Sequence, residues 1–149
     1  MKAKVFWWIC IALWWGLIYY MSSQNADSSS NQSLFIAELL NRWLRQLFGP
    51  HAVALSEDVV RKMAHFFEYC MLGSLLFMGF LDRARPGRTV LLVFAAGLLF
   101  SVSDEIHQHF VPGRTARPFD VLVDMAGIGV AVGFMYRLIL LRKRGKTAE

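Results

Sequence analysis

Histidines and carboxylates recur at helical spacing inside otherwise apolar stretches of this chain. His65 and Glu68 are three residues apart and Asp120 and Asp124 are four apart, so each pair occupies one face of a helix. A histidine beside a carboxylate suits general acid–base catalysis, because the carboxylate fixes the imidazole tautomer. The candidate catalytic residues are therefore His65, Glu68, Asp104, His107, Asp120 and Asp124.

Basic and amide side chains accompany these candidates. Arginine presents a planar fork of donors that matches a phosphate or a carboxylate, so Arg61 and Arg114 are the expected anchors for an anionic head group. The candidate substrate-binding residues are Arg61, Lys62, Ser103, Glu105, Gln108 and Arg114. No serine lies in a glycine–X–serine–X–glycine motif, so a serine nucleophile is only weakly supported.

A metal ion is the minor alternative for the same residues. His65 and Glu68 place two ligand types on one helical face. The remaining potential ligands are Asp104, His107, Asp120 and Asp124. Their spacing matches no strong metal motif and the neighbouring basic residues disfavour a cation, so we expect no metal and no other cofactor.

The composition indicates that membrane spans carry these residues. The 149 residues are 56% hydrophobic and 18% charged, with a mean hydropathy of +0.40, whereas soluble domains carry about 25% charged residues. We expect one domain over residues 1–149, and the disordered, collagen-like and coiled-coil classes are excluded. The net charge of +5 comes largely from Lys and Arg that flank apolar runs, so no nucleic-acid partner is expected. Cys10 and Cys70 lack a CxxC partner, so no redox role is inferred.

Four apolar runs are long enough to cross a bilayer, which predicts an all-α four-helix membrane bundle. The predicted spans cover about residues 5–21, 61–81, 89–108 and 120–141. The first run follows Lys2 and Lys4, as a signal peptide would, but its length and its lack of a small-residue cleavage site favour a retained anchor. In the fourth run, Gly129-x-x-x-Gly133, with Gly127 nearby, is expected to let a neighbouring backbone approach closely.

The polar segment between the first two spans contains one further element. Residues 22–33 are rich in Ser, Asn and Gln and are expected to form a loop. From Leu34 to Phe48 apolar residues recur on one helical face, and Gly49-Pro50 ends the pattern. This amphipathic helix is expected either to lie in the membrane interface or to pack on the top of the bundle, and in both cases to stay outside the site.

Lys and Arg are distributed unequally between the two sides that this topology creates. The side with both termini would hold ten of the 16 Lys and Arg residues, and the other side six. Because cytoplasmic loops carry the excess of basic residues, both termini are expected in the cytoplasm. The ionisable residues of the last three spans would then converge at the extracytoplasmic ends, on the same side as the amphipathic helix.

Five motifs follow one another along the chain. They are Ser22-Ser23-Gln24, Arg61-Lys62-x-Ala64-His65-Phe66-x-Glu68-Tyr69, Ser103-Asp104-Glu105-Ile106-His107-Gln108, Val111-Pro112-Gly113-Arg114-Thr115 and Asp120-x-x-x-Asp124-x-x-Gly127. In this order they resemble the VanZ-like family over nearly the whole chain. The resemblance implies a small multi-pass protein of the bacterial cytoplasmic membrane, similar to one linked with low-level resistance to teicoplanin, an antibiotic that acts on the cell wall. It implies a setting in the cell envelope and no particular reaction.

Three interpretations of the polar residues stay open. In the first, basic residues pair with carboxylates only to hold the helices together, although buried ion pairs are poor stabilisers. In the second, acid–base chemistry hydrolyses or transfers the head group of a membrane lipid or a lipid-linked cell-wall intermediate. In the third, the same residues bind such a head group, or a glycopeptide antibiotic, without turnover. The sequence predicts no oligomeric state.

Overall fold

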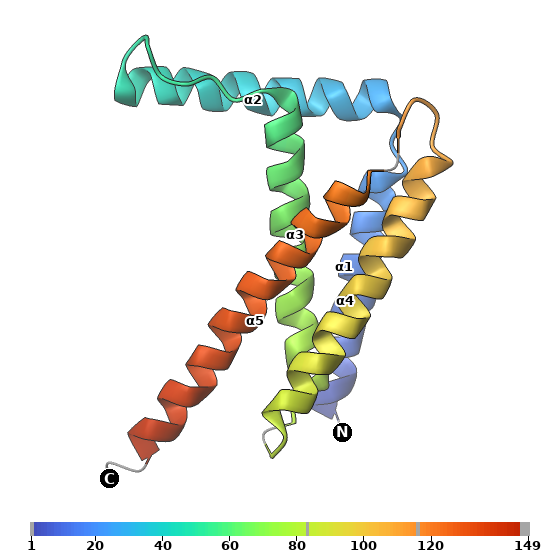
Figure 1. Cartoon of the computed structure of the whole chain (residues 1–149), viewed down its shortest axis with the longest axis vertical. Coiled ribbons are helices and arrows are strands. Elements are labelled where there is room, and N and C mark those ends of the chain that lie inside the picture. The colour runs from blue at the N-terminus through green and yellow to red at the C-terminus, as the bar shows by residue number, and fades with distance from the viewer. Residues whose placement is uncertain (1, 83, 116, 147–149) are drawn as a thin grey trace.

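The computed structural model describes residues 2–82, 84–115 and 117–146, and over these residues the chain forms five α-helices (Figure 1). The helices are α1 (Lys2–Ser22), α2 (Ala26–Phe48), α3 (Glu57–Phe80), α4 (Pro86–His109) and α5 (Pro118–Lys146). All except α2 contain a segment long and apolar enough to cross a membrane. These segments are Lys4–Ser22, Glu57–Phe80, Pro86–His109 and Pro118–Leu141. The predicted all-α fold with four spans and a separate amphipathic helix is confirmed.

The four spans run between the same two ends of the molecule, with α5 crossing α3 at an angle, and α2 lies across one of these ends (Figure 1). The α4–α5 loop lies at this same end, which we call the α2 end. The start of α1, the α3–α4 turn and the end of α5 lie at the opposite end. This arrangement agrees with an even number of membrane crossings.

Local chemistry explains where the helices begin. The Ser56 side chain accepts a hydrogen bond from the backbone N–H of Val59 and so caps α3. Proline opens both α4 and α5, at Pro86 and Pro118, where the missing N–H costs no helical hydrogen bond.

The helix α2 begins at Ala26, so the expected loop is wrong over residues 26–33. The Asn25 side chain caps the helix by accepting a hydrogen bond of 2.9 Å from the backbone N–H of Ser28. Ser29 and Ser33 are buried on the face that packs against the rest of the protein. Small polar side chains that pack closely carry no apolar periodicity, and for this reason the pattern did not reveal them.

The closest helix contact joins α3 and α5 at two glycines. A Cβ atom on Gly127 would overlap the carbonyl oxygen of Phe66 and would lie 3.0 Å from the backbone nitrogen of Cys70. A Cβ atom on Gly73 would lie 3.1 Å from the Cα atom of Ile128. The absence of side chains at these two positions therefore lets the two backbones approach each other.

The expected glycine pair lies away from this contact. A Cβ atom on Gly133 would meet nothing within 4 Å, and one on Gly129 would only reach the ring of Phe94 at 4.0 Å. Gly127 lies two residues before Gly129 and therefore faces a different neighbour, α3. The predicted close approach on the fourth span therefore occurs at Gly127, which the prediction named beside the pair, and not at Gly129 or Gly133.

The hydrophobic core lies between the spans, below the polar residues of the α2 end. Its fully buried members include Tyr69, Leu72, Leu76, Phe77 and Ile128. These residues pack α3 against α4 and α5. The bundle thereby holds the polar residues of the three helices in a fixed register.

Candidate functional site

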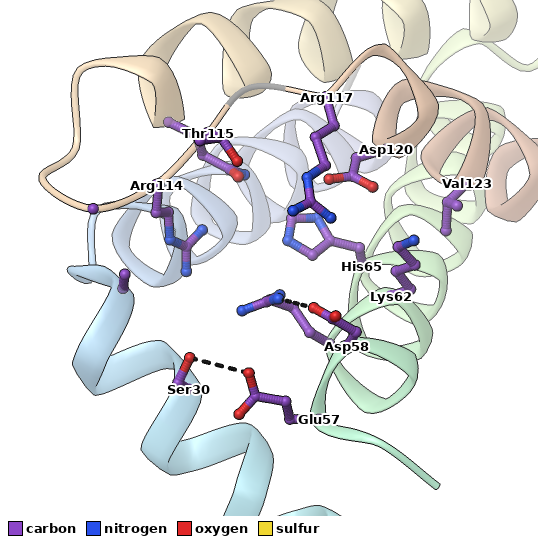
Figure 2. A pocket seen from close by; sticks show the side chains of 14 residues that line it. Ser30, Glu57, Asp58, Lys62, His65, Arg114, Thr115, Arg117, Asp120 and Val123 are labelled. Atoms are coloured by element: carbon purple, nitrogen blue, oxygen red, sulfur yellow. Dashed lines mark hydrogen bonds and ion pairs between the residues drawn. The ribbon is translucent and has the colours of Figure 1, made fainter.

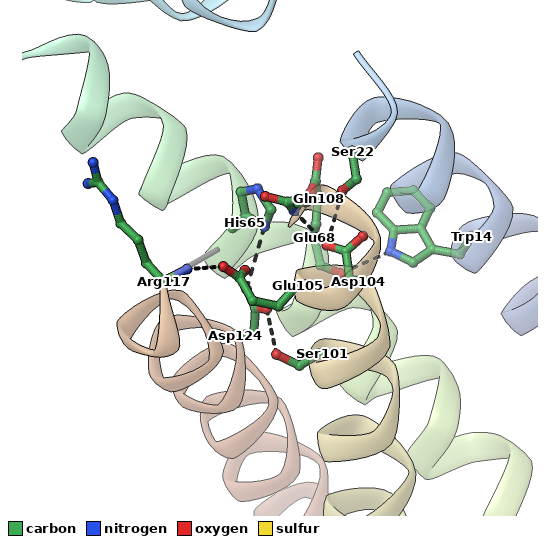
Figure 3. Close-up of polar contacts among 10 residues, drawn as sticks. All are labelled: Trp14, Ser22, His65, Glu68, Ser101, Asp104, Glu105, Gln108, Arg117 and Asp124. Atoms are coloured by element: carbon green, nitrogen blue, oxygen red, sulfur yellow. Dashed lines mark hydrogen bonds and ion pairs between the residues drawn. The ribbon is translucent and has the colours of Figure 1, made fainter. Parts of the chain in front are cut away.

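The centre of the polar region is a histidine–aspartate contact between α3 and α5 (Figure 3). His65 Nδ1 lies 3.6 Å from Asp124 Oδ1, and the Asp124 side chain is almost fully buried. Ser101 Oγ of α4 donates a hydrogen bond of 2.7 Å to the other oxygen, Asp124 Oδ2. The carboxylate is thus held by one helix and presented to the imidazole of another. A carboxylate placed next to a histidine in this way can stabilise the imidazolium form that acid–base catalysis uses.

A second buried carboxylate connects α4 to the end of α1. Asp104 Oδ2 accepts hydrogen bonds of 3.0 Å from Ser22 Oγ and 3.0 Å from Gln108 Nε2. Gln108 Nε2 also donates to Ser22 Oγ, at 3.2 Å. The first of the five sequence motifs, Ser22-Ser23-Gln24, therefore reaches the site through Ser22.

Two further acidic residues complete the buried part of the region. The half-buried Glu68 lies on α3 after His65, and its backbone carbonyl accepts a hydrogen bond of 2.9 Å from Trp14 Nε1. Glu105 is buried on α4, and its side chain accepts a hydrogen bond from the backbone N–H of Arg117 (Figure 3). Glu105 thereby fixes the chain just before α5 begins.

Buried polar atoms in this region retain unused hydrogen-bonding capacity. Among the described residues, the buried side-chain atoms without a hydrogen-bond partner are His65 Nδ1, Tyr69 Oη, Asp104 Oδ1, Asp120 Oδ1 and Asp124 Oδ1. Buried polar groups in proteins are nearly always paired, and exceptions concentrate at functional sites. Within the same described residues, no three His, Cys, Asp or Glu side chains are arranged to hold a metal ion.

A cavity of about 340 Å³ opens above His65 at the α2 end (Figure 2). Its basic lining residues are Arg61, Lys62, Arg114 and Arg117, and its acidic ones are Glu57, Asp58 and Asp120. The residues come from α2, α3, the end of α4, the α4–α5 loop and the start of α5. His65 lines this cavity and also contacts Asp124, so it joins the cavity to the buried carboxylates.

The basic residues of the cavity differ in how far their charge is already compensated. Arg61 forms an ion pair with Asp58, and Lys62 Nζ lies 4.8 Å from the centre of the Phe119 ring. Arg114 donates a hydrogen bond of 2.7 Å to a neutral group, Ser29 Oγ. Burial, and secondarily the nearby charge of Arg61, lower the pKa of Arg114. A bound anion would therefore offset the cost of burying the Arg114 charge.

The structure brings together ten of the sequence candidates and leaves two apart. Those that line the cavity are Arg61, Lys62, His65, Gln108, Arg114 and Asp120. Those in the buried region behind it are Glu68, Asp104, Glu105 and Asp124. The other two candidates, both on α4, are Ser103 and His107.

His107 and Ser103 face other surroundings. The His107 ring stacks on Tyr19 of α1 with 4.0 Å between ring centres, and His107 Nε2 lies 3.0 Å from Ser23 Oγ. Ser103 is exposed, and its hydroxyl donates to the Phe100 carbonyl of its own helix at 3.0 Å. Both residues precede an inward-facing residue by one position, which turns them by about 100° around the helix.

The first turns of α2 form one wall of the cavity, in the segment that the sequence predicts as a loop, whereas residues 34–48 do not line the cavity. Ala26 and Ser30 line the cavity, and Ser30 Oγ donates to Glu57 Oε1 at 3.5 Å. The backbone N–H of Ala26 also donates to the carbonyl of Pro112 in the α4–α5 loop, at 3.3 Å. The sequence did carry one signal for this wall, because Asn25 is a preferred helix-capping residue.

The absence of a side chain at Gly113, in the α4–α5 loop, permits this close contact between the loop and α2. Gly113 has a φ of +78°, and a Cβ atom on it would lie 2.9 Å from Ala26 Cβ. Glycine adopts a positive φ without the steric cost that a Cβ atom imposes. The Pro112-Gly113-Arg114 sequence therefore turns the loop under the start of α2 and directs Arg114 toward the cavity.

Comparison with known families assigns the chain to one of them. The model of the VanZ/LLP1 family matches residues 6–141, which include all the residues of the cavity. No curated protein and no solved structure matches the chain. The match confirms the resemblance carried by the five sequence motifs. This chain is a multi-pass membrane protein and belongs to the VanZ/LLP1 family.

Proposed function

We propose that the protein binds the anionic head group of a cell-envelope amphiphile in the cavity and acts on it with His65 and Asp124 as an acid–base pair. The observation that carries this proposal is that His65 contacts both the cavity and a buried carboxylate. It lines the cavity on one side and lies 3.6 Å from the buried Asp124 carboxylate on the other. A proton can thus pass between a bound head group and a histidine whose positive form is stabilised by Asp124.

The charges of the cavity favour a phosphate or a similar anion. Arg114 supplies a planar guanidinium that donates a hydrogen bond to a neutral hydroxyl, and Arg117 adds a second guanidinium (Figure 2). The outward face of α3 exposes Val59, Met63 and Phe67 beside the cavity, where acyl or prenyl tails can stay in lipid. A lipid-linked cell-wall intermediate has both an anionic head group and an apolar tail. The link of the VanZ name with teicoplanin resistance agrees with a substrate of this class.

Binding without turnover is the second candidate function. The 3.6 Å between His65 Nδ1 and Asp124 Oδ1 is longer than a hydrogen bond, and this distance favours binding without acid–base chemistry. In that case the cavity would retain a head group, or the antibiotic itself, and change its access to the cell wall. The two candidates differ in one measurable quantity, which is product formed from a lipid extract by the purified protein in nanodiscs.

Replacement of Arg114 by lysine tests head-group binding. Lysine keeps the charge but loses the planar fork, so affinity for a short-chain polyprenyl phosphate should fall about 10- to 100-fold, from the loss of charge-assisted hydrogen bonds. Isothermal titration of the detergent-solubilised protein measures this affinity. The matched control is Arg42→Lys on α2, because Arg42 is exposed and lies away from the cavity, in an ion pair with Glu38. Equal affinity in the two variants would contradict the proposed site.

The proposal also requires the α2 end to face the outside of the cell. In a chain with Cys10 and Cys70 replaced by alanine, a membrane-impermeant thiol reagent should label Asn31→Cys in intact cells and should not label Gly87→Cys. Both positions are exposed, at opposite ends of the bundle. Permeabilised cells, in which both sites should react, provide the control. Labelling of Gly87→Cys alone would move the cavity to the cytoplasmic side.

A further inference from the structure

One face of α2 is buried against the protein in the first half of the helix and is uncovered in the second half. In the first half this face consists of Ser29, Ser33 and Ala37, which are buried against the protein. At 3.6 residues per turn, the same face continues with Ile36, Leu40, Trp43 and Leu47. The second half of α2 extends past α3 (Figure 1), and Trp43 and Leu47 are 59% and 70% exposed. The face that rests on protein therefore continues as an uncovered apolar strip.

The opposite face of the second half carries the charges of α2. Glu38, Arg42 and Arg45 lie there, and the ion pair of 3.6 Å between Arg42 and Glu38 is well exposed. The strip and the charges thus separate cleanly, with the strip on the side of the spans. This is the pattern of a helix that lies flat at a boundary between apolar and aqueous surroundings.

The position of α2 is held by polar contacts at both of its halves. Near the first half, Arg114 donates to Ser29 as described above. Near the second half, Asn41 bonds the backbone of Leu55 twice, donating at 3.0 Å and accepting at 2.7 Å. These two bonds hold the connector between α2 and α3 against the helix. The overhanging half is therefore fixed across the ends of the spans.

We infer that the second half of α2, residues 38–48, lies in the head-group region of the bilayer with Leu40, Trp43 and Leu47 inserted among the lipids. The occupant is lipid because the strip continues an apolar surface that is already in the membrane. The helix α3 begins beneath α2 and exposes Val59 and Met63 from its first turns (Figure 1). Tryptophan also prefers this depth, where its ring is apolar and its N–H meets water. The inference is independent of the proposed function.

An environment-sensitive fluorophore on single cysteines tests this placement. The label is attached at Trp43→Cys or Leu47→Cys on the strip, and at Arg42→Cys or Arg45→Cys as matched controls on the charged face. In nanodiscs that hold one copy, a nitroxide near the lipid head group should quench the strip labels several-fold more than the control labels. Iodide in the buffer should show the reverse order. A label at Met71→Cys, exposed near the middle of α3, should respond most to a nitroxide deep in the acyl chains.

Two results would overturn the inference. Equal iodide quenching at positions 42 and 43 would mean that the strip lies in water. Protection of the strip from both iodide and nitroxide lipids would mean that protein covers it, either a second copy or a partner. Nitroxide quenching of the native tryptophans, compared between the unaltered chain and Trp43→Phe, answers the same question without replacing Cys10 and Cys70. The unaltered chain should lose more fluorescence to the shallow nitroxide than the Trp43→Phe chain.

Discussion

Asp124→Asn should lower turnover of the head-group substrate by about 10²–10⁴-fold, the usual contribution of acid–base catalysis, while the protein stays folded. Asparagine keeps an oxygen that can accept the hydrogen bond from Ser101, so the contact between α4 and α5 survives. It removes the negative charge that faces His65 Nδ1. The rate of product formation and the melting temperature, measured on the same nanodisc sample, separate chemistry from folding.

The control for this substitution is Asp82→Asn at the other end of the bundle. The Asp82 carboxylate accepts hydrogen bonds from the backbone nitrogens of Ala84 and Arg85, and an asparagine oxygen can do the same. An unchanged rate in Asp124→Asn would contradict the acid–base role of the pair. A lower melting temperature with an unchanged rate for each folded molecule would favour the interpretation that the polar residues only hold the helices together.

Gly127→Ala is expected to destabilise the protein by about 1–3 kcal/mol or more, because overpacking of this kind forces backbones apart. The new Cβ atom would overlap the Phe66 carbonyl oxygen, so α3 and α5 must separate. Phe66 follows His65 directly, and Asp124 lies one turn before Gly127. Separation at this point therefore also moves the two members of the acid–base pair apart.

Thermal melting of the purified variant, followed by the loss of monodisperse protein on gel filtration, measures this effect. The matched control is Gly133→Ala on the same helix, where the added Cβ atom meets nothing within 4 Å. The control should melt at the temperature of the unaltered chain or above it, since alanine favours helix more than glycine does. Equal melting of the two variants would show that the α3–α5 contact tolerates a side chain.

The spans could be predicted because a bilayer leaves the backbone few choices. Each stretch of about 20 apolar residues must satisfy its own hydrogen bonds, so run length alone identifies the helices. The start of α2 could not be found in this way. Residues 26–33 pack through serines, and their partners include Pro112 and Arg114, which lie far along the chain. Contacts of this kind leave no periodic signal in the segment itself.

The candidate site was predictable on two helices and ambiguous on the third. On α3 and α5 most of the site residues recur every three or four positions, as Arg61, His65 and Glu68 do, so they share one face. On α4 the polar residues from Ser103 to His109 are nearly contiguous and cover every face of the helix. Spacing could not show that Asp104 and Gln108 turn inward whereas His107 turns toward Tyr19.

The polar contacts of α1 and α2 can form only late in translation, because their partners lie far along the chain. Ser22 can bond to Asp104 only after 82 more residues have been translated. Ser29 can bond to Arg114 only after 85 more. At a translation rate of about 5–20 residues per second, these intervals last roughly 4 to 17 seconds. During that time α3 is the one helix already synthesised that packs against the first two helices. The cavity can therefore close only after the α4–α5 loop has emerged, so a ribosome that stalls in α4 leaves a membrane-inserted chain without a site.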